Sequence, residues 1–235
     1  MKKLFYQFIL LITVSLFLVA CNALGRIVEF SVENEIHHQE AMAARAAQAE
    51  AQAQAPPVIR EQGVVIDGIR WATRNVETPG TFVENPESIG MFYQWNRLQA
   101  WAATGSVTDW DNSYYRGFNN RIWARENDPC PVGWRIPTQA ELESLARATN
   151  TWIDRDGVRG RIFGTAPNQI FLPVAGSRES RNGGLRGERI DGIYWSSTGR
   201  GGSTAANLRF SPGGNVQVGS QHHAFGASIR CVAEH

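Results

Sequence analysis

Cys21 is the cysteine whose chemistry follows most directly from the residues around it. Lys2 and Lys3 give the chain a positive start, residues 4–19 form an apolar stretch, and Leu18-Val19-Ala20-Cys21 matches a bacterial lipoprotein cleavage site. The stretch is short for a membrane-spanning helix. We therefore expect residues 1–20 to be a cleaved signal peptide and Cys21 to carry the lipid anchor. The alternative is an ordinary signal peptide in which Cys21 is incidental.

Cys130 and Cys231 are the two other cysteines of the chain. A secreted protein meets an oxidising compartment, where a disulfide between two remaining cysteines is the simplest assignment. Such a bond would close a loop of about 100 residues and would contribute up to ~4–5 kcal/mol by the loop-entropy relation. Two separately buried thiols are the alternative.

Arginines in a glycine-rich stretch, among them Arg178, Arg186 and Arg189, are candidates for binding an acidic glycan or a carboxylate-bearing partner. Both lysines of the chain lie in the predicted signal, so the mature chain contains arginine but no lysine. Guanidinium groups grip carboxylates through two parallel hydrogen bonds, which lysine cannot do. Acidic residues interspersed in the stretch favour the alternative of internal salt bridges or simple solvation.

Several aromatic residues lie in the central, loop-rich part of the chain, and four of them are candidates for a ligand surface: Trp101, Trp110, Tyr114 and Tyr115. Exposed aromatic rings stack on the apolar faces of sugars or anchor a protein partner. The alternative is that they fill a small satellite core beneath a long loop.

Metal and catalytic motifs are weak in this sequence. Asp109-Trp110-Asp111-Asn112 offers oxygen ligands, but the spacing of an EF-hand calcium loop is not followed, so we predict no metal site and no cofactor. The sequence contains no Gly-x-Ser-x-Gly elbow, no His-Glu-x-x-His helix and no phosphate-binding loop. We therefore predict that the protein is not an enzyme.

An alanine-rich segment from Glu35 to Ala55 separates the predicted anchor from the rest of the chain. Alanine has the highest helix propensity, and Pro56-Pro57 would end the helix. The segment lacks a stripe of large apolar residues, so it has little to bury against a core. We predict a lipid-anchored linker and helical stalk over residues 21–62; a helical oligomerisation segment is the alternative.

Residues 63–235 have the composition of a globular domain with short strands. Val64–Trp71 predicts a hairpin with a turn at Asp67-Gly68, and Thr138 with Glu141 predicts a capping box at the start of a helix. Short apolar runs separated by glycines follow this helix. The pattern favours an α+β domain with short antiparallel strands, about two helices and long irregular loops.

The domain resembles the Fibrobacter succinogenes major paralogous domain, found in surface and secreted proteins of that bacterium and of Bacteroidetes. The resemblance rests on blocks that occur in the same order between Val64 and Val232. These blocks are Trp71-Ala72-Thr73-Arg74-Asn75-Val76, Gly90-Met91-Phe92-Tyr93-Gln94-Trp95, Cys130-Pro131-Val132-Gly133-Trp134-Arg135-Ile136-Pro137-Thr138, Leu172-Pro173-Val174-Ala175-Gly176-Ser177-Arg178, Tyr194-Trp195-Ser196-Ser197-Thr198 and Ala227-Ser228-Ile229-Arg230-Cys231-Val232.

This resemblance implies a C-type-lectin-like fold, similar also to the formylglycine-generating enzymes, with a terminal strand pair and a variable loop surface. The sugar-binding tripeptides of calcium-dependent lectins, Glu-Pro-Asn, Gln-Pro-Asp and Trp-Asn-Asp, are absent from the chain. We expect Trp71, Trp95, Trp134 and Trp195 in the core, because large aromatic residues mostly serve packing.

The sequence as a whole predicts a non-catalytic lipoprotein of the outer membrane, exposed at the cell surface or on the periplasmic face. Its lectin-like domain would bind a glycan or a protein partner; the alternative is a structural subunit of an envelope or surface-appendage assembly. The net charge of +1 gives no reason to expect nucleic acid. The membrane is expected as a partner only through the N-terminal lipid.

Overall fold

The computed structural model describes residues 35, 37–47, 61–113 and 121–234. Residues 37–47 are helical and exposed, which confirms the predicted helix over the part described. Residues 48–55, Cys21 and the predicted signal peptide lie outside the described residues. Within the described part, no helix is both long and apolar enough to cross a bilayer.

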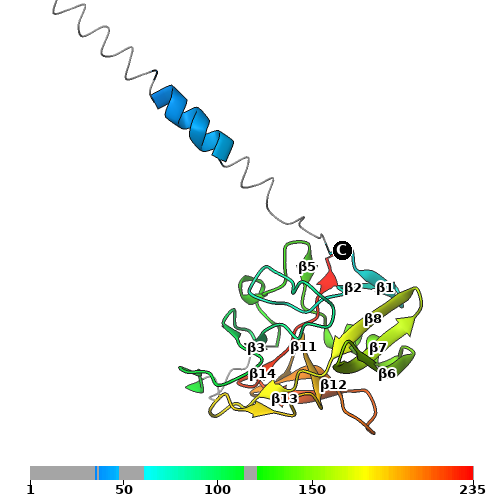
Figure 1. Ribbon diagram of the computed structural model, residues 1–235. Helices are drawn as coiled ribbons and strands as arrows, with labels where there is room; N and C mark the ends of the chain where they lie inside the picture. Colours follow the sequence, from blue (N-terminus) through cyan, green and yellow to red (C-terminus); the bar gives the residue numbers. More distant parts are fainter. Residues whose placement is uncertain (1–34, 36, 48–60, 114–120, 235) are drawn as a thin grey trace, which may run out of the picture. The chain divides into compact units, whose positions relative to one another are not determined.

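The C-terminal unit, Arg60–His235, is a mixed α+β domain, as the sequence predicted. Its described residues form four small antiparallel sheets joined by long irregular segments (Figure 1). The strands of the first sheet, in spatial order, are β1 (Val64–Ile66), β2 (Ile69–Trp71), β15 (Val232–Ala233) and β5 (Trp134–Arg135). Those of the second are β10 (Leu185–Arg186), β9 (Ser177–Arg178), β14 (Gly226–Ala227), β3 (Phe92–Gln94) and β4 (Ala100–Trp101).

The other two sheets are three-stranded meanders with longer strands. The third sheet consists of β11 (Gly192–Gly201), β12 (Thr204–Phe210) and β13 (Gln217–His222). The fourth sheet consists of β6 (Asn150–Arg155), β7 (Val158–Thr165) and β8 (Asn168–Pro173). A short 3₁₀ helix, η2, spans Arg125–Asn127. The meanders lie side by side in Figure 1, and residues of both share one hydrophobic cluster.

Helix α2, Gln139–Arg147, begins at the predicted capping box. The Thr138 hydroxyl accepts a hydrogen bond from the Glu141 N–H, and the Glu141 carboxylate accepts one from the Thr138 N–H at 2.7 Å. These contacts satisfy donors that the first turn of a helix leaves unpaired. Leu142 and Leu145 are buried, so α2 packs its apolar face against the sheets as predicted.

Strand β11 lies between two hydrophobic clusters. Tyr194 belongs to one cluster and Trp195 to the other, because neighbouring residues of a strand point to opposite faces. Both side chains are fully buried. Their polar atoms are paired, since Tyr194 Oη donates to the Pro173 carbonyl at 2.7 Å and Trp195 Nε1 donates to the Tyr93 carbonyl at 2.8 Å. A strand whose first half is buried on both faces fixes the position of the loops that adjoin it.

Three of the four tryptophans expected in the core are there: Trp71, Trp95 and Trp195 each have no exposed surface. The expectation was wrong for Trp134, which is half-buried at the edge of the second cluster. Its ring makes an edge contact with Phe82, 5.7 Å between centroids. Trp134 is the first residue of the short strand β5, directly after the tight turn at Gly133. At this position, on the border of the second cluster, its ring covers the cluster without being enclosed by it.

The predicted disulfide between Cys130 and Cys231 is present. Cys130 precedes the turn that leads into β5, and Cys231 precedes β15, which pairs with β5. The bond therefore fastens the middle of the chain to its C-terminal strand beside an existing strand pairing.

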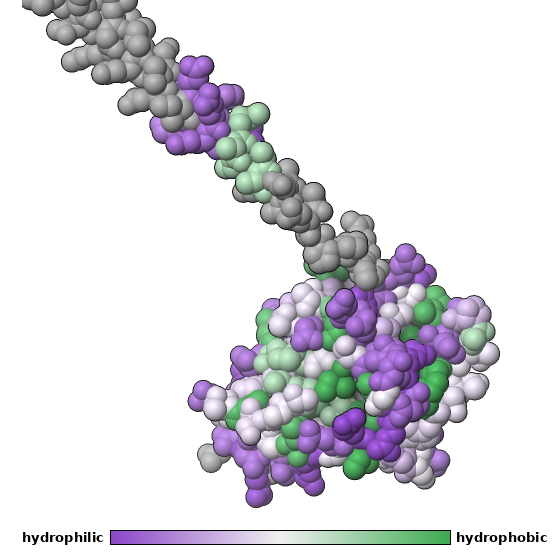
Figure 2. All heavy atoms as spheres, viewed as in Figure 1, coloured by the Kyte–Doolittle hydropathy of each residue, from purple (hydrophilic) through white to green (hydrophobic). Residues whose placement is uncertain are grey.

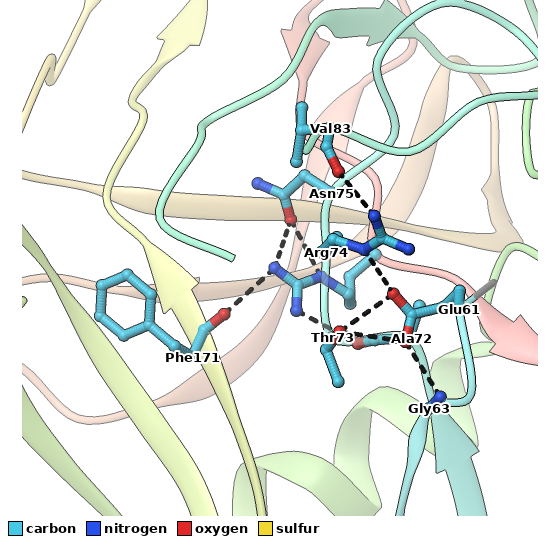
Figure 3. A network of polar contacts seen from close by, with 9 residues as sticks. Glu61, Gly63, Ala72, Thr73, Arg74, Asn75, Val83 and Phe171 are labelled. Carbon is cyan, nitrogen blue, oxygen red and sulfur yellow. Dashed lines mark hydrogen bonds and ion pairs between the residues drawn. The ribbon is translucent and has the colours of Figure 1, made fainter. Parts of the chain in front are cut away.

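Arg230, next to Cys231, is fully buried. Its guanidinium donates twice to Asn75 Oδ1, at 2.7 and 3.0 Å, and also to the carbonyls of Ala72 and Phe171 (Figure 3). Burial lowers the pKa of Arg230 to about 10, so the group stays charged at neutral pH. Because these acceptors come from two separate segments, the residues just after β2 and strand β8, one side chain holds both segments to the C-terminal segment.

Glu61 extends this polar network to the start of the domain. Its buried carboxylate accepts hydrogen bonds from the Gly63 N–H, the Thr73 hydroxyl and Arg74 Nε, each within 3.0 Å (Figure 3). Burial by itself raises the pKa of Glu61, but these hydrogen bonds, from Arg74 above all, outweigh it and lower the pKa. The first residues of the domain are thereby fixed to the strand that Arg230 also contacts.

Candidate functional site

A cleft with a volume of about 810 Å³ lies where five separate segments of the domain meet. We call it the main cleft. It is lined by Glu87, Ile89, Ala103, Thr104, Asp154, Gly157, Val158, Arg159, Val174, Ala175, Glu188 and Arg189. Its volume falls within the range of ~300–1,000 Å³ that is usual for small-molecule and cofactor sites.

One wall of the main cleft is the β6–β7 hairpin. Asp156 and Gly157 both have positive φ, 52° and 78°, which is the geometry of a two-residue type I′ turn. The turn places Asp154 directly opposite Arg159 in the strand register. Both side chains are exposed, so the hairpin presents a carboxylate and a guanidinium to the cleft.

The floor of the main cleft is apolar and is held by a buried cation. Ala103, Val174 and Ala175 are each 5% exposed or less. Arg178 lies beneath the loop that carries Ala103: its guanidinium donates to the carbonyls of Ala102 at 2.7 Å, Thr104 at 3.0 Å and Gly105 at 2.9 Å. The guanidinium also donates to the Gly183 carbonyl on a second loop. These four hydrogen bonds fix the floor of the cleft relative to β9, the strand that carries Arg178.

Another part of the cleft lining is a tight turn at the end of the glycine-rich stretch. The N–H groups of Ile190 and Asp191 both donate to the Gly187 carbonyl, at 3.0 and 2.9 Å. Arg189 has φ of 56°, in the left-handed region that side-chain-bearing residues rarely adopt. This backbone, held by its own hydrogen bonds, places the exposed Glu188 and Arg189 at the cleft.

Charges of both signs surround the apolar floor. Glu87, Asp154 and Glu188 supply carboxylates, and Arg159 and Arg189 supply guanidinium groups. Glu87 is already paired with Arg155 at 3.2 Å, outside the cleft lining. The remaining groups can both donate and accept hydrogen bonds, which suits a ligand that carries hydroxyl, carboxylate or amide groups.

The arginines predicted as a ligand surface divide into two kinds. Arg178 is 1% exposed and bonded to four carbonyls, so it supports the main cleft and does not face a ligand. Arg189 does line the main cleft. Arg186 is exposed, pairs with Glu179 at 3.2 Å and lines a different cavity, described below.

The aromatic residues predicted as part of that surface lie elsewhere. Trp101 is 9% exposed and packs 4.8 Å from Trp110, ring centroid to ring centroid. Trp110 is half-buried and its Nε1 donates to the Ser180 carbonyl at 3.0 Å. These two tryptophans therefore match the satellite-core alternative. Tyr114 and Tyr115 lie outside the described residues.

Metal-binding groups do not gather in the described part of the chain: no cluster of three or more His, Cys, Asp or Glu side chains is placed to hold an ion. The Asp109–Asn112 loop is held by its own hydrogen bonds instead, with Ser113 N–H donating to Asp111 Oδ1 at 3.0 Å. Arg97 also pairs with the Asp111 carboxylate, at 3.3 Å.

The sequence argument did not single out the β6–β7 hairpin, which supplies a third of the lining. An Asp-Gly pair, Asp156-Gly157, stands between two runs of strand-forming residues and could have revealed it. Glu87 and Ala103 carried no such signal, because nothing in their neighbourhood indicates that they meet.

Comparisons with protein families, with curated proteins and with solved structures found no match to this chain.

Proposed function

We propose that this chain is a non-catalytic, lipid-anchored binding protein of the outer membrane, and that its main cleft binds a glycan. The main cleft, with charged walls above an apolar floor, is the observation that carries the proposal. Sugars present hydroxyl groups that pair with carboxylates and guanidinium groups, and C–H faces that contact apolar surface. We assign the domain to the C-type-lectin-like fold on the resemblance stated above.

Two features favour a glycan over a protein partner. A specific protein interface buries about 800 Å² on each partner and is mostly flat, whereas the main cleft is concave and of small-molecule size. On the face seen in Figure 2, hydrophobic residues are scattered among hydrophilic ones and form no broad apolar patch. Obligate assemblies usually depend on such patches.

The location outside the cytoplasm is supported by the disulfide, because such bonds persist in oxidising compartments. Replacing Cys21 with serine (Cys21→Ser) tests the anchor directly. We expect the variant to leave the membrane fraction and to lose incorporation of a labelled fatty acid. A variant that still takes up label would exclude acylation at this residue. Protease added to intact cells then separates surface exposure from the periplasmic face.

Glycan-array binding of the detergent-solubilised full chain tests the function. We expect selective binding that falls at least tenfold in Arg159→Gln and Arg189→Gln. Arg181→Gln is the matched control: Arg181 is exposed on the same glycine-rich stretch but does not line the main cleft. Co-purification with envelope proteins at fixed stoichiometry, without glycan binding, would contradict the proposal and favour the structural-subunit alternative.

A further inference from the structure

A second groove lies on the β11–β12–β13 sheet, separate from the main cleft. We call it the sheet groove. It has a volume of about 380 Å³ and is lined by Ser177, Arg186, Asp191, Ile193, Arg209, Ser220, Gln221, His222 and Phe225. A smaller cavity of about 120 Å³ shares Asp191, Ile193 and Arg209 with it and continues to Asn215 and Gln217. None of these residues lines the main cleft.

Arg209 is the central cation of the sheet groove. It stands between Ile193 on β11 and Gln217 on β13 in the strand register, and it lines both cavities. Its side chain is exposed, and among the described residues it has no ion pair or side-chain hydrogen bond. The other arginine of the groove, Arg186, forms one ion pair, with the half-exposed Glu179 at 3.2 Å.

Gly219 allows the Arg209 side chain to lie along the sheet. A Cβ atom added at Gly219 would lie 3.2 Å from Arg209 Cδ and 4.0 Å from its Cγ. The contact is tighter than ordinary packing. The aliphatic part of the Arg209 side chain therefore passes over Gly219 on β13, where a Cβ atom would be in close contact with it.

The other groups in the sheet groove recognise polar rings more than simple ions. Asp191 accepts hydrogen bonds, Gln221 both donates and accepts, and Phe225 offers an aromatic surface to C–H groups. The Ala224 N–H donates to His222 Nδ1 at 3.3 Å, which places the imidazole proton on Nε2 in the neutral form. Burial lowers the pKa of His222, which favours that neutral form near pH 7.

We propose that the sheet groove binds a carboxylate-bearing sugar ring, with Arg209 and Arg186 gripping the carboxylate and Asp191 and Gln221 bonding the hydroxyls. Two guanidinium groups against one carboxylate leave the lining with an excess of positive charge. An acidic ring is thereby preferred over a neutral one. A planar guanidinium binds a carboxylate through two hydrogen bonds, a geometry that a hydroxyl cannot reproduce.

NMR titration of the solubilised full chain with glucuronate, glucose and acetate tests this proposal. We expect glucuronate to bind at least tenfold more tightly than either of the others. Equal affinity for glucose would overturn carboxylate recognition, and equal affinity for acetate would reduce the groove to a general anion site. The amide resonances that shift distinguish the two sites: glucuronate is expected to shift those of Gly219 and Gln221 on β13, and shifts confined to Gly157 and Val158 of the main cleft would overturn the assignment.

Variants assign the binding to the sheet groove. Arg209→Gln is expected to remove the preference for glucuronate over glucose, and Gly219→Ala to weaken it by displacing the Arg209 stem. Arg147→Gln is the matched control, because Arg147 is exposed on α2, which packs against the other face of the same sheet. Glucuronate binding that survives Arg209→Gln, or that is lost equally in Arg147→Gln, would overturn the assignment. Unchanged circular dichroism of each variant shows that the fold is retained.

Discussion

The C-terminal segment 226–232 and the glycine-rich loop 179–191 share glycine, serine and arginine, yet they differ in almost every physical respect. Every residue of 226–232 is buried, whereas most of 179–191 is exposed. Arg230 in the first segment has four hydrogen bonds to groups from two other segments. Arg186 in the second has one exposed ion pair.

This difference indicates that burial decides whether an arginine of this protein supports the fold or is available to a ligand. A buried guanidinium must have its donors satisfied, so it binds carbonyls and fixes the segments that carry them. An exposed guanidinium in a cavity keeps its donors in water and can exchange them for a ligand. Arg178 is a buried, supporting arginine, although it directly precedes the glycine-rich loop that carries the exposed arginines. The following four changes test the contrast, from the largest expected effect to the smallest.

Removing the disulfide next to Arg230 is expected to have the largest effect. In the double variant Cys130→Ser, Cys231→Ser the unfolded chain regains the freedom of a loop of about 100 residues, which corresponds to about 4 kcal/mol of lost stability. Urea unfolding of both proteins under oxidising conditions measures this loss. If the midpoint is unchanged, the buried polar contacts alone hold the C-terminal segment.

Arg230→Met is expected to lower the free energy of unfolding by about 3 kcal/mol. The substitution keeps an apolar stem but leaves buried acceptors, including Asn75 Oδ1 and the Phe171 carbonyl, without their donor. Arg186→Met is the paired control on the exposed loop and should change stability by less than about 0.5 kcal/mol. Equal losses in both variants would break the distinction between the two kinds of arginine.

Acidification is expected to weaken the scaffold through Glu61. Its pKa in the folded protein lies below the ordinary value of 4.5, so its contribution to stability is fully present above that pH. The contribution is lost as the pH falls through the lower, folded-state pKa. In Glu61→Gln we expect about 2 kcal/mol less stability at pH 7, and a difference from the natural protein that shrinks below pH 4.5. A constant difference from pH 7 to pH 3 would contradict the assignment.

The exposed pair of Arg186 and Glu179 is expected to have the smallest effect. Both side chains are more than a third exposed. Exposed ion pairs of this kind typically contribute about 0.2–1 kcal/mol, and we expect a coupling of about 0.5 kcal/mol here. A double-mutant cycle with Arg186→Gln and Glu179→Gln measures the coupling. A coupling above 2 kcal/mol would show that the loop is part of the rigid scaffold.

Several elements of the fold could be predicted because their signals are local. The capping box of Thr138 and Glu141 and the turn at Asp67-Gly68 depend only on residues a few positions apart. The β6–β7 hairpin was missed although Asp156-Gly157 carries the same kind of signal. Trp134 was placed too deep, because a match to a family block says nothing about which residues border the cluster.

The candidate sites could be predicted only in part. Arg189 and Arg186 were predicted as part of a ligand surface on charge and flexible backbone alone; each lines a cavity, and ligand binding by either stays a prediction. The same reasoning included Arg178, because a buried and an exposed arginine look alike when their neighbours are glycines. Arg209 was not singled out, since its position in the sheet groove follows from the register of β12 against β11 and β13.

The sequence by itself predicted the disulfide between Cys130 and Cys231, the start of α2 and the α+β class, because these depend on the number of cysteines, on capping residues and on the local apolar pattern. The tertiary structure alone decided which arginines became supports and which lined cavities. The main cleft joins residues as far apart as Glu87 and Arg189. Contacts between such distant segments depend on how whole sheets pack, and no short stretch of residues carries that information.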